Sequence, residues 1–482
     1  IQADHTYAVD SLSATTNGNL LVNDSAPANT VITEVNGVTV NGTGTTTING
    51  QYGTLTIDAK GNYTYTLRSG LGADGINTPD SFVYKVKAPN GDTGSASLNI
   101  KPTPQALDAV NDVSSTMAVT TQADTSRSFT DDSVGNASWS AQLLSPTSKS
   151  GTGVIEIATG TAVQNAILHF NVASGLTLGG LTVTWALYDS NNIKIAGNSF
   201  NGGLLVGGNI DIALSGIVLH PGNYRLDYTG SVGGLGLGNI TITPSVKGTI
   251  IDLQNFETST ANSVTGNIYD GDHIASVHTL LTVNGTGGST ATLDPLSSTT
   301  SAIINGLYGK LTIGIDGHYT YALNSDVSLS TIVTKETFTY TLNDQNGHTD
   351  TATLTINMNP QVVSTVDADR LTGSAYGDTL IYHLLNANDA TGGNISNGAT
   401  DTWTNFSLAQ GDKIDIGDLL VGWNGQNATL GNYLTVTTSG NNTVIAIDRD
   451  GTGNTYHSTN LITLENVHTT LDELVQQNHI VP

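Results

Sequence analysis

Two stretches of this chain are nearly identical, and their repetition constrains the fold more than any other feature. INGQYGTLTIDAKGNYTYTL (48–67) and INGLYGKLTIGIDGHYTYAL (304–323) align without a gap, with 13 of 20 positions identical. A second pair, DSFVYKVKAPNGDTGSASLNI (80–100) and ETFTYTLNDQNGHTDTATLTI (336–356), has the same offset of 256 residues (336 minus 80). We interpret the repeat as one structural module present in two copies.

Both copies alternate their residues with a period of two, as at Tyr63, Tyr65 and Leu67. Such alternation indicates strands with one buried face. The turn sequences AKGN and PNGD in the first copy, and IDGH and QNGH in the second, separate these strands. We therefore predict that each copy is an antiparallel β-sandwich of roughly 100 residues. Tyr319 and Tyr321 repeat the tyrosine pair, and we expect all four rings to pack rather than to bind a ligand.

The length and the charge limit the remaining possibilities. A chain of 482 residues is too long for a single core, which favours roughly three to five domains. The formal net charge is −25, with 34 Asp against 6 Glu, so the chain has little Lys or Arg to meet nucleic acid or an anionic membrane. Asp is common in turns and in loops that bind Ca²⁺.

The absence of certain residues and patterns excludes several kinds of chemistry and of membrane attachment. Without cysteine there is no thiol catalysis, no Cys-ligated zinc and no disulfide. No apolar run approaches the roughly 20 residues that span a bilayer. The first residues, IQADHTYAVD, have neither an initiator Met nor a signal-peptide pattern, so we expect a fragment of a longer chain.

The repeated copies resemble the VCBS or bacterial cadherin-like repeats of giant bacterial surface adhesins. The resemblance rests on GNLLVND (18–24), on VNG, on YGTLTIDAKGNYTYTL and on the strand pair FVYKV and NGDTGSASLNI. The second copy departs from this pattern at its start, where GNIYDGD (266–272) stands, and that puts a ligand role for Asp270 and Asp272 in doubt.

The residues between the copies, from about 106 to 247, match neither copy. ALDAVNDVSS (106–115) looks like the opening of another such repeat or the linker into it. Alternating runs then follow, separated by Gly-rich turns, and they predict a further sandwich, with LHPGNYRLDYTG (219–230) similar to a late jelly-roll strand of carbohydrate-binding modules. Trp139 and Trp185 lie in this segment, and we consider them as candidate ligand contacts, although core packing is the commoner role for a lone Trp on a strand.

The last section, from about 366, resembles the C-terminal target domain of type I secretion substrates. DADRLTGSAYGDTLIYHLLNANDATGGN (367–394) begins like a degenerate glycine–aspartate RTX repeat, and DTWTNFSLAQGDKIDIGDLLVGW (401–423) and LITLENVHTTLDELVQQNHIV (461–481) follow it. Thr469 with Asp472 predicts a capping-box-like helix start, and Leu471, Leu474 and Val475 then form one apolar face of a short helix.

Calcium is the cofactor that these residues favour. Asp448 and Asp450 stand two apart before Gly451, which allows a loop to turn both carboxylates towards one cation, although a plain Asp-Gly hairpin turn is the alternative. The resemblance to an RTX-type region strengthens the metal interpretation. The further candidate Ca²⁺ ligands are Asp367, Asp369 and Asp378 in the β-roll stub, Asp389, Asn394 and Asp401 in an acidic loop, and Asp108, Asn111 and Asp112 at a module junction.

Catalysis finds no support, and we expect no enzymatic activity. There is no H-E-x-x-H and no G-x-S-x-G, and Glu156, Glu257 and Glu336 are each isolated in the sequence. A surface or turn position is the expected role for each of them.

We therefore predict an all-β protein with tandem antiparallel Ig/cadherin-like sandwiches in an extended array and a β-rich C-terminal domain with one short helix. The expected domains are 1–104, 105–248, 249–362 and 363–482.

The function we infer is that of the C-terminal part of a Bap-type biofilm adhesin on the bacterial surface, exported by type I secretion and stabilised by Ca²⁺. Its expected partners are the secretion machinery and a host or abiotic surface, a matrix polysaccharide or a like adhesin. The alternatives are a carbohydrate-binding module at 105–248 and a secreted polysaccharide-degrading enzyme.

Overall fold

The computed structural model describes residues 5–10, 15–68, 78–103, 107–132, 134–177, 180–201, 208–259, 263–275, 278–325, 327–345, 347–383 and 399–482. Within these ranges the regular secondary structure is almost entirely β-strand, with one short α-helix at Leu471–Gln476, which confirms the predicted fold class. The chain divides into two compact units. The first unit contains residues 1–117, 261–324 and 335–357, and the second contains 118–260, 325–334 and 358–482.

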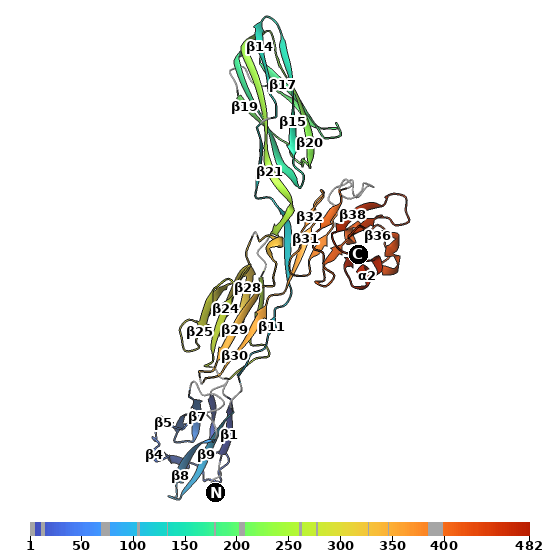
Figure 1. Ribbon diagram of the computed structural model, residues 1–482. Coiled ribbons are helices and arrows are strands. Elements are labelled where there is room, and N and C mark those ends of the chain that lie inside the picture. The colour runs from blue at the N-terminus through green and yellow to red at the C-terminus, as the bar shows by residue number, and fades with distance from the viewer. Residues whose placement is uncertain are drawn as a thin grey trace. The chain divides into compact units, whose positions relative to one another are not determined.

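The first repeat is a β-sandwich, drawn in blue in Figure 1. One sheet has the order β1-β9-β8-β3-β4 and the other the order β2-β7-β6-β5. Its strands are β1 (His5–Asp10), β2 (Thr15–Asn19), β3 (Val31–Val35), β4 (Val38–Thr39), β5 (Thr45–Asn49), β6 (Gly53–Asp58), β7 (Asn62–Leu67), β8 (Asp80–Lys87) and β9 (Thr93–Thr103). Along β7 and β8 buried and exposed residues alternate without a break, as the period of two predicts.

The second repeat has the same two-layer arrangement. Its sheets have the orders β11-β30-β29-β24-β25 and β22-β28-β27-β26, and the short β10 pairs with β23. The strands are β10 (Leu107–Asp108), β11 (Asp112–Val113), β22 (Ser263–Asn267), β23 (His273–Ile274), β24 (Leu280–Gly285), β25 (Thr290–Leu293), β26 (Ser301–Asn305), β27 (Gly309–Gly314), β28 (His318–Leu323), β29 (Thr337–Asn343) and β30 (Thr349–Thr355).

Strands β10 and β11 of the second sandwich are separated from the rest of that sandwich in the sequence. In the first repeat β1 pairs in parallel with β9, with His5 opposite Leu98, and in the second β11 pairs in parallel with β30, with Asp112 opposite Leu354. Leu98 and Leu354 are equivalent at the repeat offset of 256 (354 minus 98), so β11 replaces β1. The next strand, β22, begins only at Ser263. Residues 118–260 are thus an insertion within the second sandwich.

This topology differs from the predicted domain ranges. The residues at 107–117, expected to open the unique domain, belong to the second sandwich instead. The predicted boundary at 248 falls inside β21 (Leu235–Thr258), a single strand of 24 residues. ALDAVNDVSS is therefore the opening of the second repeat, one of the two interpretations of that phrase.

One buried carboxylate holds the same hairpin turn in each sandwich. Asp80 is 2% exposed and accepts hydrogen bonds from the backbone N–H groups of Gln51 (2.8 Å), Tyr52 (2.9 Å) and Gly53 (3.3 Å) and from the Tyr65 hydroxyl (2.8 Å). Glu336 has this role in the second sandwich. It is fully buried and accepts from the N–H groups of Leu307 (3.0 Å) and Tyr308 (2.8 Å) and from the Tyr321 hydroxyl (3.0 Å).

The burial of Glu336 corrects the expectation of a surface or turn position for this residue. Its carboxylate satisfies buried donors that the turn leaves without a backbone partner, which is why a charged side chain is stable in the core.

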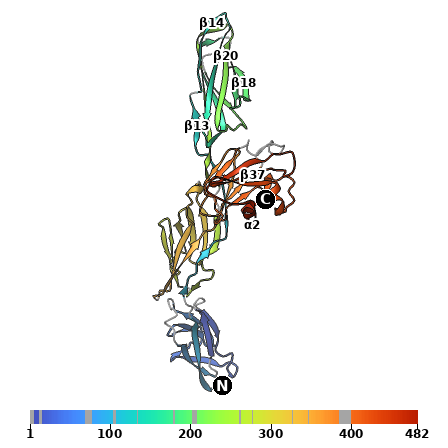
Figure 2. The ribbon, with the colours of Figure 1, turned by 45° about the vertical axis from the view of Figure 1, so that its right-hand side comes forward.

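The insertion folds as a sandwich of its own, and Figures 1 and 2 show its green strands from two directions. One sheet has the order β15-β20-β17-β18, and the other joins β19, β16, β21 and β12, with β13 and β14 also on β21. The strands are β12 (Met117–Asp124), β13 (Ser128–Asp131), β14 (Ala137–Leu143), β15 (Thr147–Ile157), β16 (Thr161–Thr177), β17 (Leu181–Tyr188), β18 (Lys194–Asn201), β19 (Gly208–Ala213), β20 (Gly222–Val232) and β21.

The C-terminal segment winds between two sheets, with parallel strands in each. From β31 to β35, consecutive short strands alternate between the sheet that continues from β12 through β31, β33, β35 and β39 and the sheet ordered β32-β34-β38-β37-β36. Strands β36, β37 and β38 then follow one another in the second sheet as antiparallel neighbours. The elements are β31 (Met358–Val363), β32 (Arg370–Leu371), β33 (Thr379–Ile381), β34 (Asp401–Trp403), β35 (Lys413–Asp415), β36 (Leu434–Ser439), β37 (Asn442–Ile447), β38 (Thr459–Leu464), α2 (Leu471–Gln476) and β39 (Ile480–Val481). Short 3-10 helices span Leu329–Thr331, Gly417–Leu419 and Asn427–Asn432.

The predicted helix is present, but its cap lies one residue later than expected. Thr470 is the N-cap, because its backbone is extended (φ −118°, ψ 163°) and its hydroxyl accepts from the Glu473 N–H. Thr469 instead donates to the Glu473 carboxylate at 2.9 Å. Leu474 is the residue of the helix that is buried in the core.

Candidate calcium-binding loops and the inserted sandwich

The region expected to be a β-roll stub contains two turns with the same hydrogen bonds, nine residues apart (378 minus 369). Asp369 accepts from the backbone N–H of Thr365 at 2.6 Å and from its hydroxyl at 2.7 Å. Asp378 accepts from the N–H of Ser374 at 2.6 Å and from its hydroxyl at 2.7 Å. Each carboxylate therefore closes its own turn, and the same contacts recur after nine residues.

The next coil places a second carboxylate beside each of these. Asp401 accepts from the Asp369 N–H at 2.9 Å, and Asp412 accepts from the Asp378 N–H at 2.9 Å. Asp401 also accepts from the Tyr382 hydroxyl at 2.8 Å. Asp412 was not among the predicted residues. In the sequence, Asp412 is a single Asp within AQGDK (409–413), and no glycine–aspartate repeat was recognised around it.

Burial raises the pKa of these four carboxyl groups, and the charge of a neighbouring Asp adds to the shift at Asp369, Asp378 and Asp401. Burial raises the pKa of Asp378 and of Asp401 to about 7 and that of Asp412 to about 6, and the Asp412 carboxylate adds to the shift at Asp378. The pKa of Asp369 is raised by burial and by the neighbouring Asp401. A proton or a cation at these pairs would relieve the repulsion between the two charges.

The other candidates near this region are placed differently. Asp367 lies with its carboxylate oxygens 2.9 and 3.0 Å from His220 Nδ1, and this contact raises the pKa of that imidazole. Asp389 and Asn394 lie outside the described residues. Of the three residues in the predicted acidic loop, the structure therefore describes only Asp401.

Asp448 and Asp450 come together in the turn after β37, as the Asp-Gly pattern predicts. Gly451 has a φ of +62°, which a residue with a Cβ adopts with strain. Asp450 accepts from the Thr455 N–H at 2.9 Å, and this bond lowers its pKa. Asp448 Oδ1 is buried and has no hydrogen-bond partner among the described residues, and the pKa of Asp448 is raised by desolvation and then by Asp450.

This loop fits a hard cation better than the other candidates do. An oxygen that lacks a donor and faces a second carboxylate has the chemistry of a Ca²⁺ ligand, because Ca²⁺ binds carboxylate and carbonyl oxygens. Two carboxylates do not complete a site of six to eight oxygens. Within the described residues, no group of three or more His, Cys, Asp or Glu side chains is arranged to hold a metal ion.

At the predicted junction site the three residues have separate tasks. The Tyr340 hydroxyl lies 3.0 Å from Asp112 Oδ2 and 2.9 Å from Asp272 Oδ2, so the two carboxylates compete for its single proton. Asn111 accepts from the Thr353 N–H at 2.9 Å, which ties the opening segment to β30. Asp108 belongs to the short strand β10. Burial raises the pKa of Asp112 to about 6, and Asp272 contributes to that shift by its charge.

Asp272 is a residue that the sequence pattern placed in doubt. It corresponds to Asp24 of the first repeat, whose carboxylate lies 3.4 Å from the Tyr84 hydroxyl, and Tyr84 corresponds to Tyr340. The phrase GNIYDGD therefore keeps the contact between its last Asp and a core tyrosine, even though its middle residues differ.

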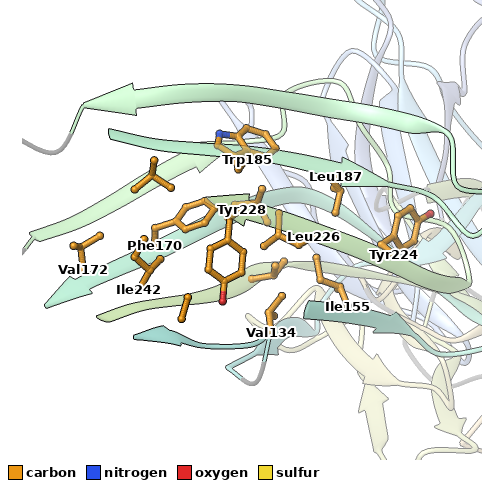
Figure 3. Close-up of a cluster of buried hydrophobic side chains, with 14 of the residues drawn as sticks. Val134, Ile155, Phe170, Val172, Trp185, Leu187, Tyr224, Leu226, Tyr228 and Ile242 are labelled. Carbon is orange, nitrogen blue, oxygen red and sulfur yellow. The ribbon is translucent and has the colours of Figure 1, made fainter. Parts of the chain in front are cut away.

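The two tryptophans of the insertion are not exposed stacking platforms. Trp185 is 4% exposed, and its ring centroid lies 6.5 Å from that of Phe170. Figure 3 shows both rings in the core between the two sheets. Trp139 is half-buried, and its indole N–H donates to the Thr147 hydroxyl at 3.3 Å. Both positions agree with core packing, the commoner role for a lone Trp on a strand, and a ligand contact at either residue stays a prediction.

Comparison with known families identifies one part of the chain. Residues 1–101 match the family model of a bacterial Ig domain. The first sandwich is a bacterial Ig-like domain. The match covers less than half of the chain, and no curated protein matches this sequence. Within the described residues, no helix is long and apolar enough to cross a membrane.

Similarity to solved structures is low. The enzymatically active domain of tailspike protein 4 of bacteriophage CBA120 is 15% identical, with 28% of this chain and 19% of that chain covered and a TM-score of 0.18. An infectious bursal disease virus structure is 12% identical, with 49% and 71% covered and a TM-score of 0.18. A carbohydrate-binding module of the β-sandwich superfamily is 13% identical, with 48% and 94% covered and a TM-score of 0.14. These TM-scores are too low to bear on architecture or function.

Proposed function

We propose that this chain is part of a bacterial surface adhesin, with two Ig-like sandwiches as a scaffold and the inserted sandwich as its binding domain. The observation that carries the proposal is the topology of the second repeat, which holds an unrelated sandwich of 143 residues (118–260) between its strands β11 and β22. Scaffold modules recur because they extend a chain, whereas a domain present once is free to specialise. A bacterial Ig-like domain is compatible with a protein at the cell surface.

The insertion can be removed without cutting the scaffold, and this allows a direct test. The two ends of the insertion lie together, because the Ser259 N–H donates to the Thr120 carbonyl oxygen at 3.1 Å and Thr121 pairs with Thr258. A variant with residues 125–251 replaced by a short Gly-Ser linker keeps β12, the pairing of Asp124 with Asp252 and the contact of Phe256 with the core of the C-terminal segment, and it should keep the second sandwich folded.

The assay is competition. Purified chain is added to bacteria that settle on glass or on a polysaccharide-coated surface, and attached cells are counted. We expect the full chain to reduce attachment and the excised chain to lose that effect with its calorimetric transitions for the two repeats intact. Equal competition by both chains would place adhesion in the scaffold, and no competition by either would contradict the adhesin role.

Ca²⁺ binding at the loop of Asp448 and Asp450 is part of the proposal. The orphaned Asp448 oxygen supports it, and an extracellular site with a Kd of about 10⁻⁴ to 10⁻³ M would add roughly 0.5–2 kcal/mol at millimolar Ca²⁺. We expect the unfolding temperature of the C-terminal segment to rise with Ca²⁺ over EGTA in the native chain. The increase should vanish in Asp448→Asn with Asp450→Asn and persist in the surface control Asp92→Asn.

Export by type I secretion through the segment 363–482 completes the proposal. The winding of strands between two sheets, with nine-residue contact periodicity at Asp369 and Asp378, supports the RTX-like resemblance of this segment. A fusion of a reporter to 363–482 should appear in the medium of cells that have a type I exporter and stay inside cells without one. Binding, rather than turnover of a polysaccharide, is the role proposed, and release of reducing sugar from matrix polysaccharide would contradict it.

A further inference from the structure

The inserted sandwich has an open side between the edge strands of its two sheets. Strand β18 is the last strand of the sheet ordered β15-β20-β17-β18, and β19 is the first strand of the other sheet. A groove with a volume of about 400 Å³ lies along these two strands. This volume falls within the range of about 300–1,000 Å³ that is usual for sites that bind small ligands.

The strand register places a polar side chain in the core-facing row of β18. Trp185 belongs to the buried row of β17, and its partner across the antiparallel ladder is Asn198. Ladder partners lie on the same face of a sheet, so Asn198 stands on the core side, between Ala196 and Phe200, which pack against the core. Asn198 is exposed, and its side-chain oxygen accepts from the Ser199 N–H at 2.8 Å. Its amide N–H groups are therefore the donors that it offers to the groove.

Trp185 adds a second donor. It lines the groove and is 4% exposed, and Figure 3 shows its ring at one edge of the core cluster. Its indole nitrogen is buried and has no hydrogen-bond partner among the described residues. A buried donor without an acceptor is destabilising, and native proteins give such groups a partner. The Trp185 N–H is thus a donor that an acceptor bound in the groove would satisfy.

The rest of the groove is apolar and uncharged. Phe200, Ile212 and Ile217 contribute apolar surface, and Ser199 and Ser215 contribute hydroxyl groups. Among the described residues that line the groove none is charged, although the chain has a formal net charge of −25. A charged ligand would lose its hydration here without gaining a counter-ion, so the groove favours an uncharged ligand.

We propose that this groove binds an uncharged saccharide. A sugar ring has C–H faces that pack on Phe200 and Ile212, and it has hydroxyl groups that both donate and accept hydrogen bonds. One hydroxyl oxygen accepts from the Trp185 N–H, and another accepts from the Asn198 amide. The inference rests on the proposed function and deepens it, because it names the site and the ligand class of the inserted sandwich.

An extended peptide is the competing occupant, because β18 and β19 are both sheet edges. The backbone N–H and C=O groups of a strand added to β18 would lie in the plane of the sheet and pair with β18. The Trp185 indole lies on the core side of this sheet, so an added strand would offer it only side chains. A saccharide satisfies the buried donor with any of several hydroxyl groups, and this favours the saccharide.

The Trp185 indole N–H itself reports binding in an NMR titration of the full chain. The chain has four Trp residues, and with ¹⁵N-labelled indoles the signal that is absent from Trp185→Phe belongs to Trp185. The neutral probes are cellotetraose, maltotetraose and laminaritetraose. Tetragalacturonic acid is the charged counterpart, and an extended peptide of alternating Val and Thr is the strand-like counterpart. We expect at least one neutral tetrasaccharide to shift the Trp185 signal saturably, and the acid and the peptide to leave it unchanged.

A matched pair of variants tests the site without touching the buried ring. Asn198→Leu removes the amide and narrows the groove at an exposed position, and isothermal titration should show an affinity for that tetrasaccharide reduced by about tenfold or more. Asn201→Leu is the control, because Asn201 is exposed on the same strand but lies opposite Thr182 on the outer face. Calorimetric unfolding of both variants shows that the sandwich is intact. Equal affinities of the two variants would overturn the site.

The remaining outcomes separate this inference from the adhesive role. A Trp185 signal that no probe shifts, that only the peptide shifts, or that the acid shifts as strongly as the neutral sugars would overturn the uncharged saccharide. A chain that binds a tetrasaccharide but does not compete for attachment keeps the site and loses the adhesive role. A chain that competes for attachment while its Trp185 signal is unchanged keeps the adhesive role and loses the site.

Discussion

The buried carboxylate at the hairpin turn of each sandwich makes a quantitative prediction. Replacing Asp80 by Ala removes the acceptor of three donors that are buried, namely the Tyr52 N–H, the Gly53 N–H and the Tyr65 hydroxyl. A buried donor without a partner costs about 1–3 kcal/mol. Allowing for a water that reaches some of them, we expect a loss of about 3–6 kcal/mol in the free energy of unfolding of the first sandwich.

Hydrogen exchange measured by mass spectrometry gives this loss for one sandwich at a time. Amides in peptides that cover 48–67 exchange through opening of the first sandwich, so their rates in Asp80→Ala should rise about 10²–10⁴-fold. Peptides that cover 304–323 report on the second sandwich and should exchange as in the native chain. Glu336→Ala should reverse the pattern.

Tyr65→Phe is the control for the loss of one hydrogen bond without an orphaned donor, and we expect it to cost about 1–2 kcal/mol. The reasoning fails if Asp80→Ala accelerates exchange in 48–67 by less than tenfold, or if peptides of both sandwiches accelerate equally. The first result would mean that water replaces the carboxylate at little cost, and the second that the two sandwiches unfold together.

Three further predictions concern the second unit. Asp378 and Asp401 have a pKa of about 7 in the folded chain against an ordinary value of 3.8, so the folded state holds more protons between these two values. In EGTA the unfolding temperature of the C-terminal segment should therefore fall as the pH rises from about 4 to 7, and a flat profile would contradict the burial. Gly230→Ala should destabilise the inserted sandwich by about 1–3 kcal/mol in calorimetry, because the new Cβ would lie 2.5 Å from Trp139 Cη2, whereas Gly233→Ala, with open space around it, should not. Thr470→Ala should cost about 1 kcal/mol in chemical denaturation by removing the N-cap of α2, and an unchanged midpoint would show that the cap is replaced by solvent.

The sequence determined the local structure of this protein because local structure depends on neighbours along the chain. The alternation at Tyr63 and Tyr65 indicated strands with one buried face, and both rings are buried in the first sandwich. The apolar face of Leu471 and Leu474 indicated α2, with an error of one residue in its cap, since two adjacent threonines cannot be distinguished without their backbone angles. The Asp-Gly turn likewise indicated that Asp448 and Asp450 lie together.

Only the tertiary structure decided which segments share a sandwich and which carboxylates are buried. Strand β11 is two residues long and pairs with a strand 242 residues away (354 minus 112), so it has no periodicity of its own to show that it belongs to the second repeat. Glu336 stands between polar residues and looked like a surface group, yet the turn at Leu307 folds over it and supplies its donors. The sequence around Trp185 is likewise compatible with a core position or with a ligand contact, and only the fold shows that the ring is buried. Burial and pairing across such separations depend on how distant strands meet, and that information lies in no single stretch of the chain.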